Sequence, residues 1–120
     1  MKKLFNLLFC LGLFSCNKPE ESRKPENMIP KGEMVRILAD IHTTEALIEA
    51  NIIHPDTAIM VFNTEQERIL KNHDVTEEQF KSTYNYYLTH LSEMDALYEE
   101  IVDTLSVRES KAKLKKEQKP

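Results

Sequence analysis

The sequence contains very little glycine, no tryptophan and only two cysteines. Its two glycines, Gly12 and Gly32, are too few to build a phosphate-binding loop. Such loops need several glycines close together, because backbone amides must approach the phosphate groups closely. Nucleotide-dependent enzymes that use the two common glycine-rich loops are therefore excluded.

The N-terminus has the pattern of an export signal. Residues 1–3 are Met-Lys-Lys, and an apolar run follows over residues 4–14 that only Asn6 interrupts. This run has the length of a signal-peptide core and is shorter than the roughly 20 residues that a helix needs to span a bilayer. Its end, Leu13-Phe14-Ser15-Cys16, resembles the lipobox of bacterial lipoproteins, in which the cysteine is acylated and becomes the new N-terminus.

The resemblance to a lipobox implies a signal peptide of residues 1–15 and a lipid anchor on Cys16. Cys10 then leaves with the signal and Cys16 carries the lipid, so no thiol remains for nucleophilic catalysis, zinc binding or a disulfide. Two or three acyl chains hold a protein stably on a membrane. The alternative is an ordinary signal peptide followed by an unmodified cysteine, or an uncleaved anchor.

Residues 16–30 are expected to form a flexible tether between the lipid and a folded domain. The segment contains three prolines among charged residues and shows no periodic apolar positions. Its start, Asn-Lys-Pro-Glu-Glu, loosely resembles signals that send some Bacteroidota lipoproteins to the cell surface. A polar linker is the simpler interpretation.

The rest of the chain predicts an all-α fold, a small bundle of about three helices over residues 31–105. Hydrophobic residues make up 41% of the chain and charged residues 30%, which favours a folded core. A first helix is expected over residues 31–52. A second is expected after Pro55-Asp56, with Asp56 as its cap, and should end near residues 72–74. The apolar positions with helical spacing are Met34, Ile37, Leu38, Ile41, Ile48 and Ile52 in the first and Ile59, Phe62, Ile69 and Leu70 in the second.

The third predicted helix begins at Thr76, which forms a capping box with Gln79. Apolar and aromatic residues then alternate at steps of four and three, which is the heptad pattern of packed helices. These positions are Phe80, Tyr84, Tyr87, Leu91, Met94, Tyr98, Ile101 and Leu105. We expect this stripe to cover the first two helices; a coiled coil with a partner is the alternative.

Residues 106–120 form a basic tail, with six basic and two acidic residues. Basic residues complement the dipole at a helix C-terminus, so a solvated and fraying end is the simple interpretation. Attraction to anionic lipid headgroups or RNA is the alternative. Without interleaved aromatic residues or a basic folded domain, we expect no nucleic-acid partner.

Asp40, His42 and Glu45 form the only cluster in the sequence that suggests site chemistry. His42 and Glu45 are three apart and so adjacent on a helix, as metal ligands or an acid–base pair would be. Asp40 points elsewhere on the same helix, and two ligands are too few unless another histidine converges on them. We therefore expect no metal, no cofactor and no enzymatic activity.

Glu45 also falls inside the apolar stripe of the first predicted helix, as Gln66 does in the second. A buried carboxylate must be hydrogen-bonded or protonated, because an unpaired buried charge costs several kcal/mol. The sequence therefore predicts a polar site in the core in which Glu45 is bonded to Gln66, Tyr84 or Tyr87, with His42 nearby. A rotated helix with Glu45 at a wet edge is the alternative.

Taken in order, the motifs resemble a family of small Bacteroidota lipoproteins known as domain of unknown function 4296. The residues that carry this resemblance are Ile29-Pro30, Met34-Val35, Ile37-Leu38, Asp40-Ile41-His42, Glu45-Ala46, Val75-Thr76, Glu78, Phe80 and Tyr86-Tyr87. The resemblance implies an envelope lipoprotein, anchored most simply in the outer membrane, and brings no established activity. We expect a non-catalytic accessory subunit that binds an envelope protein; a small-ligand or metal-binding module using His42 and Glu45 is the alternative.

Overall fold

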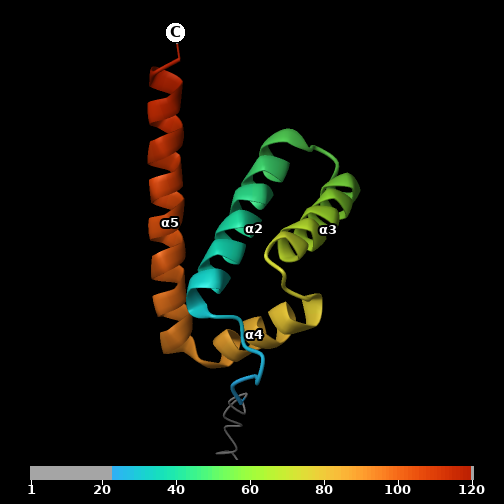
Figure 1. The fold of residues 1–120 in the computed structure, drawn as a ribbon. Helices are drawn as coiled ribbons and strands as arrows, with labels where there is room; N and C mark the ends of the chain where they lie inside the picture. The colour runs from blue at the N-terminus through green and yellow to red at the C-terminus, as the bar shows by residue number, and fades with distance from the viewer. Residues whose placement is uncertain (1–22, 120) are drawn as a thin grey trace, which may run out of the picture.

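The computed structural model describes residues 23–119, and this part of the chain contains four helices (Figure 1). They are α2 (Lys31–Asn51), α3 (Pro55–Asn72), α4 (Glu77–Thr89) and α5 (Leu91–Glu117), and this part of the chain contains no strand. The all-α prediction is confirmed, but the expected number of helices was too small. The predicted signal peptide and the predicted lipidation site, Cys16, lie outside the described residues.

Helix α2 is the central element, because both α3 and α5 pack on it. The short connection at residues 52–54 reverses the chain, and Pro55 begins α3 at a position where its missing N–H costs nothing. The predicted cap, Asp56, lies instead within the first turn, and His54 is the N-cap. The predicted α2 positions Met34, Ile37, Leu38 and Ile41 are buried. Ile48 and Ile52 are only half-buried, since α5 diverges from α2 toward that end (Figure 1).

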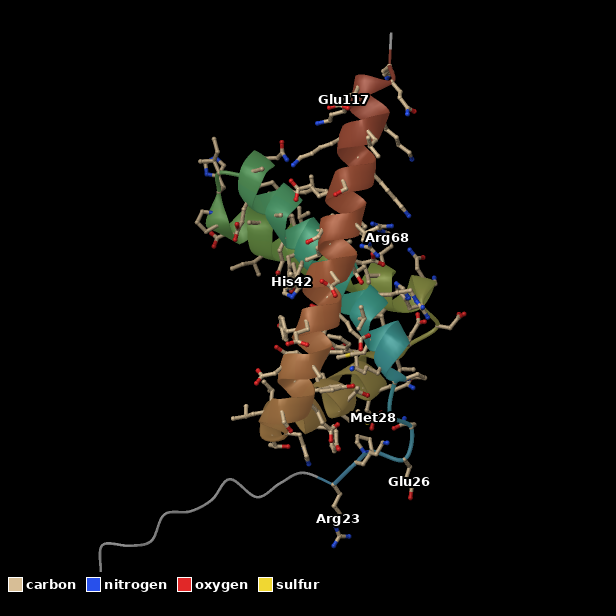
Figure 2. The ribbon with its side chains drawn as sticks, turned by 90° about the vertical axis from the view of Figure 1, so that its left-hand side faces the viewer. Arg23, Glu26, Met28, His42, Arg68 and Glu117 are labelled. Atoms are coloured by element: carbon tan, nitrogen blue, oxygen red, sulfur yellow. The ribbon has the colours of Figure 1, made fainter. Side chains whose placement is uncertain are left out.

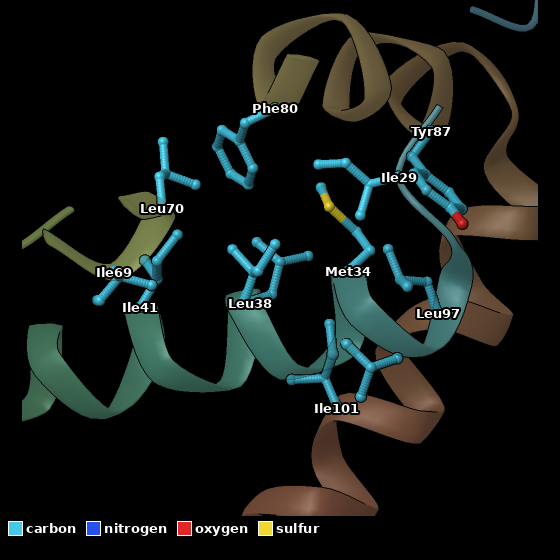
Figure 3. Close-up of a cluster of buried hydrophobic side chains, with 12 residues drawn as sticks. Ile29, Met34, Leu38, Ile41, Ile69, Leu70, Phe80, Tyr87, Leu97 and Ile101 are labelled. Carbon is cyan, nitrogen blue, oxygen red and sulfur yellow. The ribbon is translucent and has the colours of Figure 1, made fainter. Parts of the chain in front are cut away.

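One hydrophobic core joins all four helices (Figure 3). Its buried members are Ile29, Met34, Val35, Ile37, Leu38, Ile41, Ile69, Leu70, Phe80, Tyr87, Leu97 and Ile101. The predicted α3 stripe is confirmed at Ile69 and Leu70, whereas Ile59 is 60% exposed. The core therefore lies at the end of the molecule where α4 closes it.

The third predicted helix is two helices, because the chain bends at His90. The His90 ring stacks on Tyr86, with ring centroids 3.9 Å apart, and its Nδ1–H donates a 2.7 Å hydrogen bond to the Tyr86 carbonyl. Side-chain bonds of this kind compete with the helical hydrogen-bond ladder. The bend leaves Leu91, a predicted core position, 72% exposed, and Leu97 is fully buried instead.

The basic tail is not a separate segment, since α5 continues through it to Glu117. An i,i+4 ion pair between Glu109 and Lys113, 2.7 Å apart, and the lysines of the last turns favour the helix. Arg108 contacts the body of the protein, and every described residue after it is exposed. The tail is solvated as expected, but it is helical and begins after Arg108.

The end of the predicted tether belongs to the domain. The Ile29 backbone N–H donates a 3.1 Å hydrogen bond to Thr83 Oγ1, and both residues are almost fully buried. Thr76 caps α4 as predicted, by accepting from the Gln79 backbone N–H. The Gln79 side chain reaches the Asn27 carbonyl instead of turning back to Thr76. The folded domain therefore begins before residue 31.

Replacing Thr83 tests this attachment. Thr83→Val keeps the shape of the side chain but leaves the buried Ile29 N–H unpaired, which costs about 1–3 kcal/mol. We expect a lower free energy of unfolding in urea and faster hydrogen exchange at the Ile29 amide. Thr83→Ser, which keeps the hydroxyl, should leave that amide protected; rapid exchange in both variants would contradict the assignment.

Candidate functional site

His42 and Glu45 are hydrogen-bonded to each other on α2, where both residues are half-buried. His42 Nδ1 lies 2.9 Å from Glu45 Oε2, and the Glu45 side chain is 44% exposed. The expected bond from Glu45 to a tyrosine or to Gln66 is wrong, because its partner is His42. The bond to His42 forms within one turn of α2, and the aromatic residue beside His42 is Tyr98 of α5, with ring centroids 6.0 Å apart.

Of the other residues of the predicted polar core site, only Tyr84 approaches this pair. It does so through Tyr98: burial first, and then the charge and hydrogen bond of Tyr84, raise the pKa of Tyr98. Tyr84 is half-buried and stacks on Phe80, with ring centroids 6.0 Å apart. Tyr87 is buried in the hydrophobic core, where burial raises the pKa of its hydroxyl. Gln66 lines a groove between α3 and α4. Tyr84 therefore lies near His42 and Glu45, whereas Tyr87 and Gln66 lie elsewhere in the domain.

The His42 ring keeps one unsatisfied atom. Its Nε2 is buried and has no hydrogen-bond partner. Among the described residues, no three histidine, cysteine, aspartate or glutamate side chains are grouped so that they could hold a metal ion. Ligand binding at His42 and Glu45 stays a prediction.

A second and more extensive charged cluster forms where α3 ends. His73 is the C-cap of α3, and Asp74 follows it with a left-handed backbone, φ 54°. The Val75 N–H bonds to the Leu70 carbonyl and the Asp74 N–H to the Lys71 carbonyl, which is the Schellman arrangement. This tight ending fixes the backbone of His73 and directs its ring toward α2.

The His73 ring lies between two carboxylates of α2. Its Nδ1 is bonded to Glu33 Oε1, and its Nε2 lies 2.8 Å from Asp40 Oδ2. The other oxygen of Asp40 accepts a 2.8 Å hydrogen bond from Arg108 Nη1 of α5. We call Glu33, Asp40, His73 and Arg108 the charged cluster; it connects α2, α3 and α5.

The carboxylates set the protonation of the histidine. Burial lowers the pKa of His73, but the hydrogen bonds and charges of Asp40 and Glu33 outweigh it, so that pKa is raised. Arg36 first, and His73 second, lower the pKa of Glu33. Both shifts favour an imidazolium between two ionised carboxylates, with the Arg108 guanidinium balancing part of the negative charge.

This arrangement is suited to holding helices together. Both nitrogens of His73 are engaged by carboxylates, so neither is free to accept a proton from a bound molecule. Asp40 is likewise engaged on both oxygens. The charged cluster therefore acts as an electrostatic connection among three helices.

Sequence reasoning did not predict the charged cluster. Asp40 does point away from His42, but its role appears only when α3 and α5 are in place. Glu33 and Asp40 are seven residues apart and so lie on one helical face, and this spacing indicates that both carboxylates could contact the same partner. Nothing in the sequence pattern fixed which histidine meets them, because that depends on where α3 ends.

The described residues thus define a small all-helical domain closed by a charged cluster. The chain belongs to the family described as Domain of unknown function (DUF4296), whose model matches residues 25–111. The matched range contains both the docked residue Ile29 and the α5 contact Arg108. Searches of curated proteins and of solved structures found no match to the chain.

The charged cluster makes stability depend on pH. Because the folded pKa of His73 is raised above the unfolded value of about 6.5, its contribution is complete below pH 6.5. It is lost as the pH rises through the folded pKa. We expect His73→Asn to lower the free energy of unfolding by about 1–3 kcal/mol at pH 6, and by less at pH 9.

Urea unfolding of both proteins from pH 5 to pH 9 measures this difference. His54→Gln is the control, because His54 is exposed and makes no capping hydrogen bond at the start of α3, and glutamine is not a preferred capping residue. A difference between wild type and His73→Asn that stays constant across this pH range would show that the ring is not held as an imidazolium.

Proposed function

We propose that the protein is a lipid-anchored component of the bacterial cell envelope, attached through Cys16 to the outer membrane. The observation that carries this proposal is the sequence Leu13-Phe14-Ser15-Cys16 directly after a short apolar run with a basic start. The acyl chains would supply the membrane affinity. No helix within residues 23–119 is both long and apolar enough to cross a bilayer.

We further propose that the folded domain is a non-catalytic interaction subunit that binds another envelope protein. Large apolar side chains are exposed around the connection between α2 and α3. Ile53 is 92% exposed, and Leu47, Ile59 and Met60 are each at least 60% exposed. Exposed apolar groups gathered in one region commonly mark a protein-binding surface. We call these four residues the apolar tip.

The anchor is tested by changing its single sulfur. Cys16→Ala removes the acylation site, so we expect the variant to be soluble or to accumulate as a longer, uncleaved precursor. Membrane fractionation and immunoblotting measure both outcomes. Cys10→Ala is the matched control and should leave the protein processed and in the membrane. A Cys16→Ala protein that is membrane-bound and of mature size would disprove the lipoprotein assignment.

The interaction role is tested by purifying the tagged full-length chain from envelope membranes. We expect an envelope protein to co-purify in constant proportion and to be lost from the Ile53→Ser, Met60→Ser variant. Leu88→Ser is the control, because Leu88 is exposed on α4, away from the apolar tip. The same co-purifying protein in all three preparations would rule out the apolar tip as its binding surface.

A further inference from the structure

The last turns of α5 carry a helix face that nothing in the molecule covers. Val107 and Leu114 are 52% and 55% exposed. Lys111 lies between them in the sequence, and Lys115 directly follows Leu114. Residues 107, 111, 114 and 115 have the spacing of a single helical face. We call these four residues the α5 end face.

The lysines of the α5 end face have no ion-pair partner among the described residues, whereas Lys113 on the other side is paired with Glu109. Lys111 and Lys115 are four residues apart, and like charges at this spacing destabilise an isolated helix. A helix end without tertiary contacts is itself marginally stable in water. A carboxylate-bearing surface would relieve both effects.

The chain contains such a surface between α3 and α4. A groove of about 720 Å³ lies there, and Leu70 and Val75 supply apolar groups to its lining. Glu67, Asp74 and Glu77 line it as well, against a single cation, Lys71. Glu67 and Asp74 have no ion-pair partner within residues 23–119. We call this the α3–α4 groove.

The two surfaces cannot meet within one molecule. Helix α5 packs on α2 and α4 and makes no contact with α3. Its free end projects beyond the turn that joins α2 to α3, whereas the groove lies at the opposite end of α3 (Figure 1). Met28 and Glu117 likewise lie toward opposite ends of the molecule (Figure 2).

We propose that the α5 end face docks into the α3–α4 groove of a second copy of this chain. Charge complementarity identifies the occupant: residues 31–105 carry 15 acidic and 5 basic residues, and the basic excess of the chain lies in residues 106–120. Leu114 enters between the apolar groups Leu70 and Val75 of the other copy. Lys111 and Lys115 approach its carboxylates, Glu67 and Asp74.

The contact is heterologous, because one surface of each copy meets a different surface of the next. Such contacts generate closed rings or open chains of subunits. The inference goes beyond the proposed function, since it requires neither the lipid on Cys16 nor another envelope protein. A failure of either proposal leaves the other standing.

Co-capture of two differently tagged full-length chains from detergent-solubilised membranes tests the contact. Wild-type copies should capture one another. Lys111→Glu with Lys115→Glu in both copies should reduce capture by about tenfold or more, because like charges then face the groove. Leu114→Ser, which leaves every charge in place, should also reduce it.

Substitutions in the α3–α4 groove test the other side of the contact, and a mixed pair of variants tests whether capture is restored. Glu67→Lys with Asp74→Asn in both copies should reduce capture equally; asparagine tolerates the left-handed backbone at this position. When one copy carries the lysine reversals and the other the groove changes, capture should return. Thermal unfolding should match wild type for each protein.

A matched control separates docking from general electrostatics. Lys113→Glu with Lys116→Glu changes the net charge by the same amount on other faces of α5 and should leave capture intact. The proposal is overturned if wild-type copies do not capture one another, if this control reduces capture as strongly, or if the mixed pair fails to restore it. An anionic lipid surface as the true occupant would give the first of these results.

Discussion

The burial of α2 on two sides is the constraint on which the rest of this structure depends. A helix of 21 residues with apolar groups over much of its circumference needs cover from more than one partner. Helix α3 covers one side of α2, because the chain reverses its direction directly after α2. Helix α5 covers the other side only after α4 has carried the chain around the end of the core. The charged cluster and the docking of Ile29 both follow from that path.

The N-terminal attachment and the bend at His90 cooperate in closing the core. Ile29 fills the space beside Met34 and Leu97 and joins α4 through Thr83 (Figure 3). A continuous helix from Thr76 to Leu105 would project away from α2 along part of its length. The bend instead returns the chain along α2, so that Leu97 and Ile101 become buried.

The sequence predicted the positions of the helices more reliably than the contacts between residues of different helices. The periodicity of α2 and α3 and the cap at Thr76 are local properties, and they could be read directly. The interruption at His90 could not, because the heptad pattern continues across it and the contacts of His90 with the ring and carbonyl of Tyr86 are not visible in a spacing pattern. The partner of Glu45 was mistaken for the same reason: which aromatic residue covers His42 depends on the direction of α5. The charged cluster joins residues far apart in sequence, so no spacing rule identifies it in advance.

The free end of α5 has a mechanical consequence. Beyond Arg108 the helix extends by nine residues, which is a length of about 14 Å. The last hydrogen bond between this helix and the body of the domain joins the Arg108 guanidinium to Asp40. Asp40 is also bonded to His73 at the C-terminal end of α3. A sideways force on this segment therefore acts on the ion pair between Arg108 and Asp40. Through Asp40 it reaches His73 and the C-terminal end of α3, which α5 itself does not pack against.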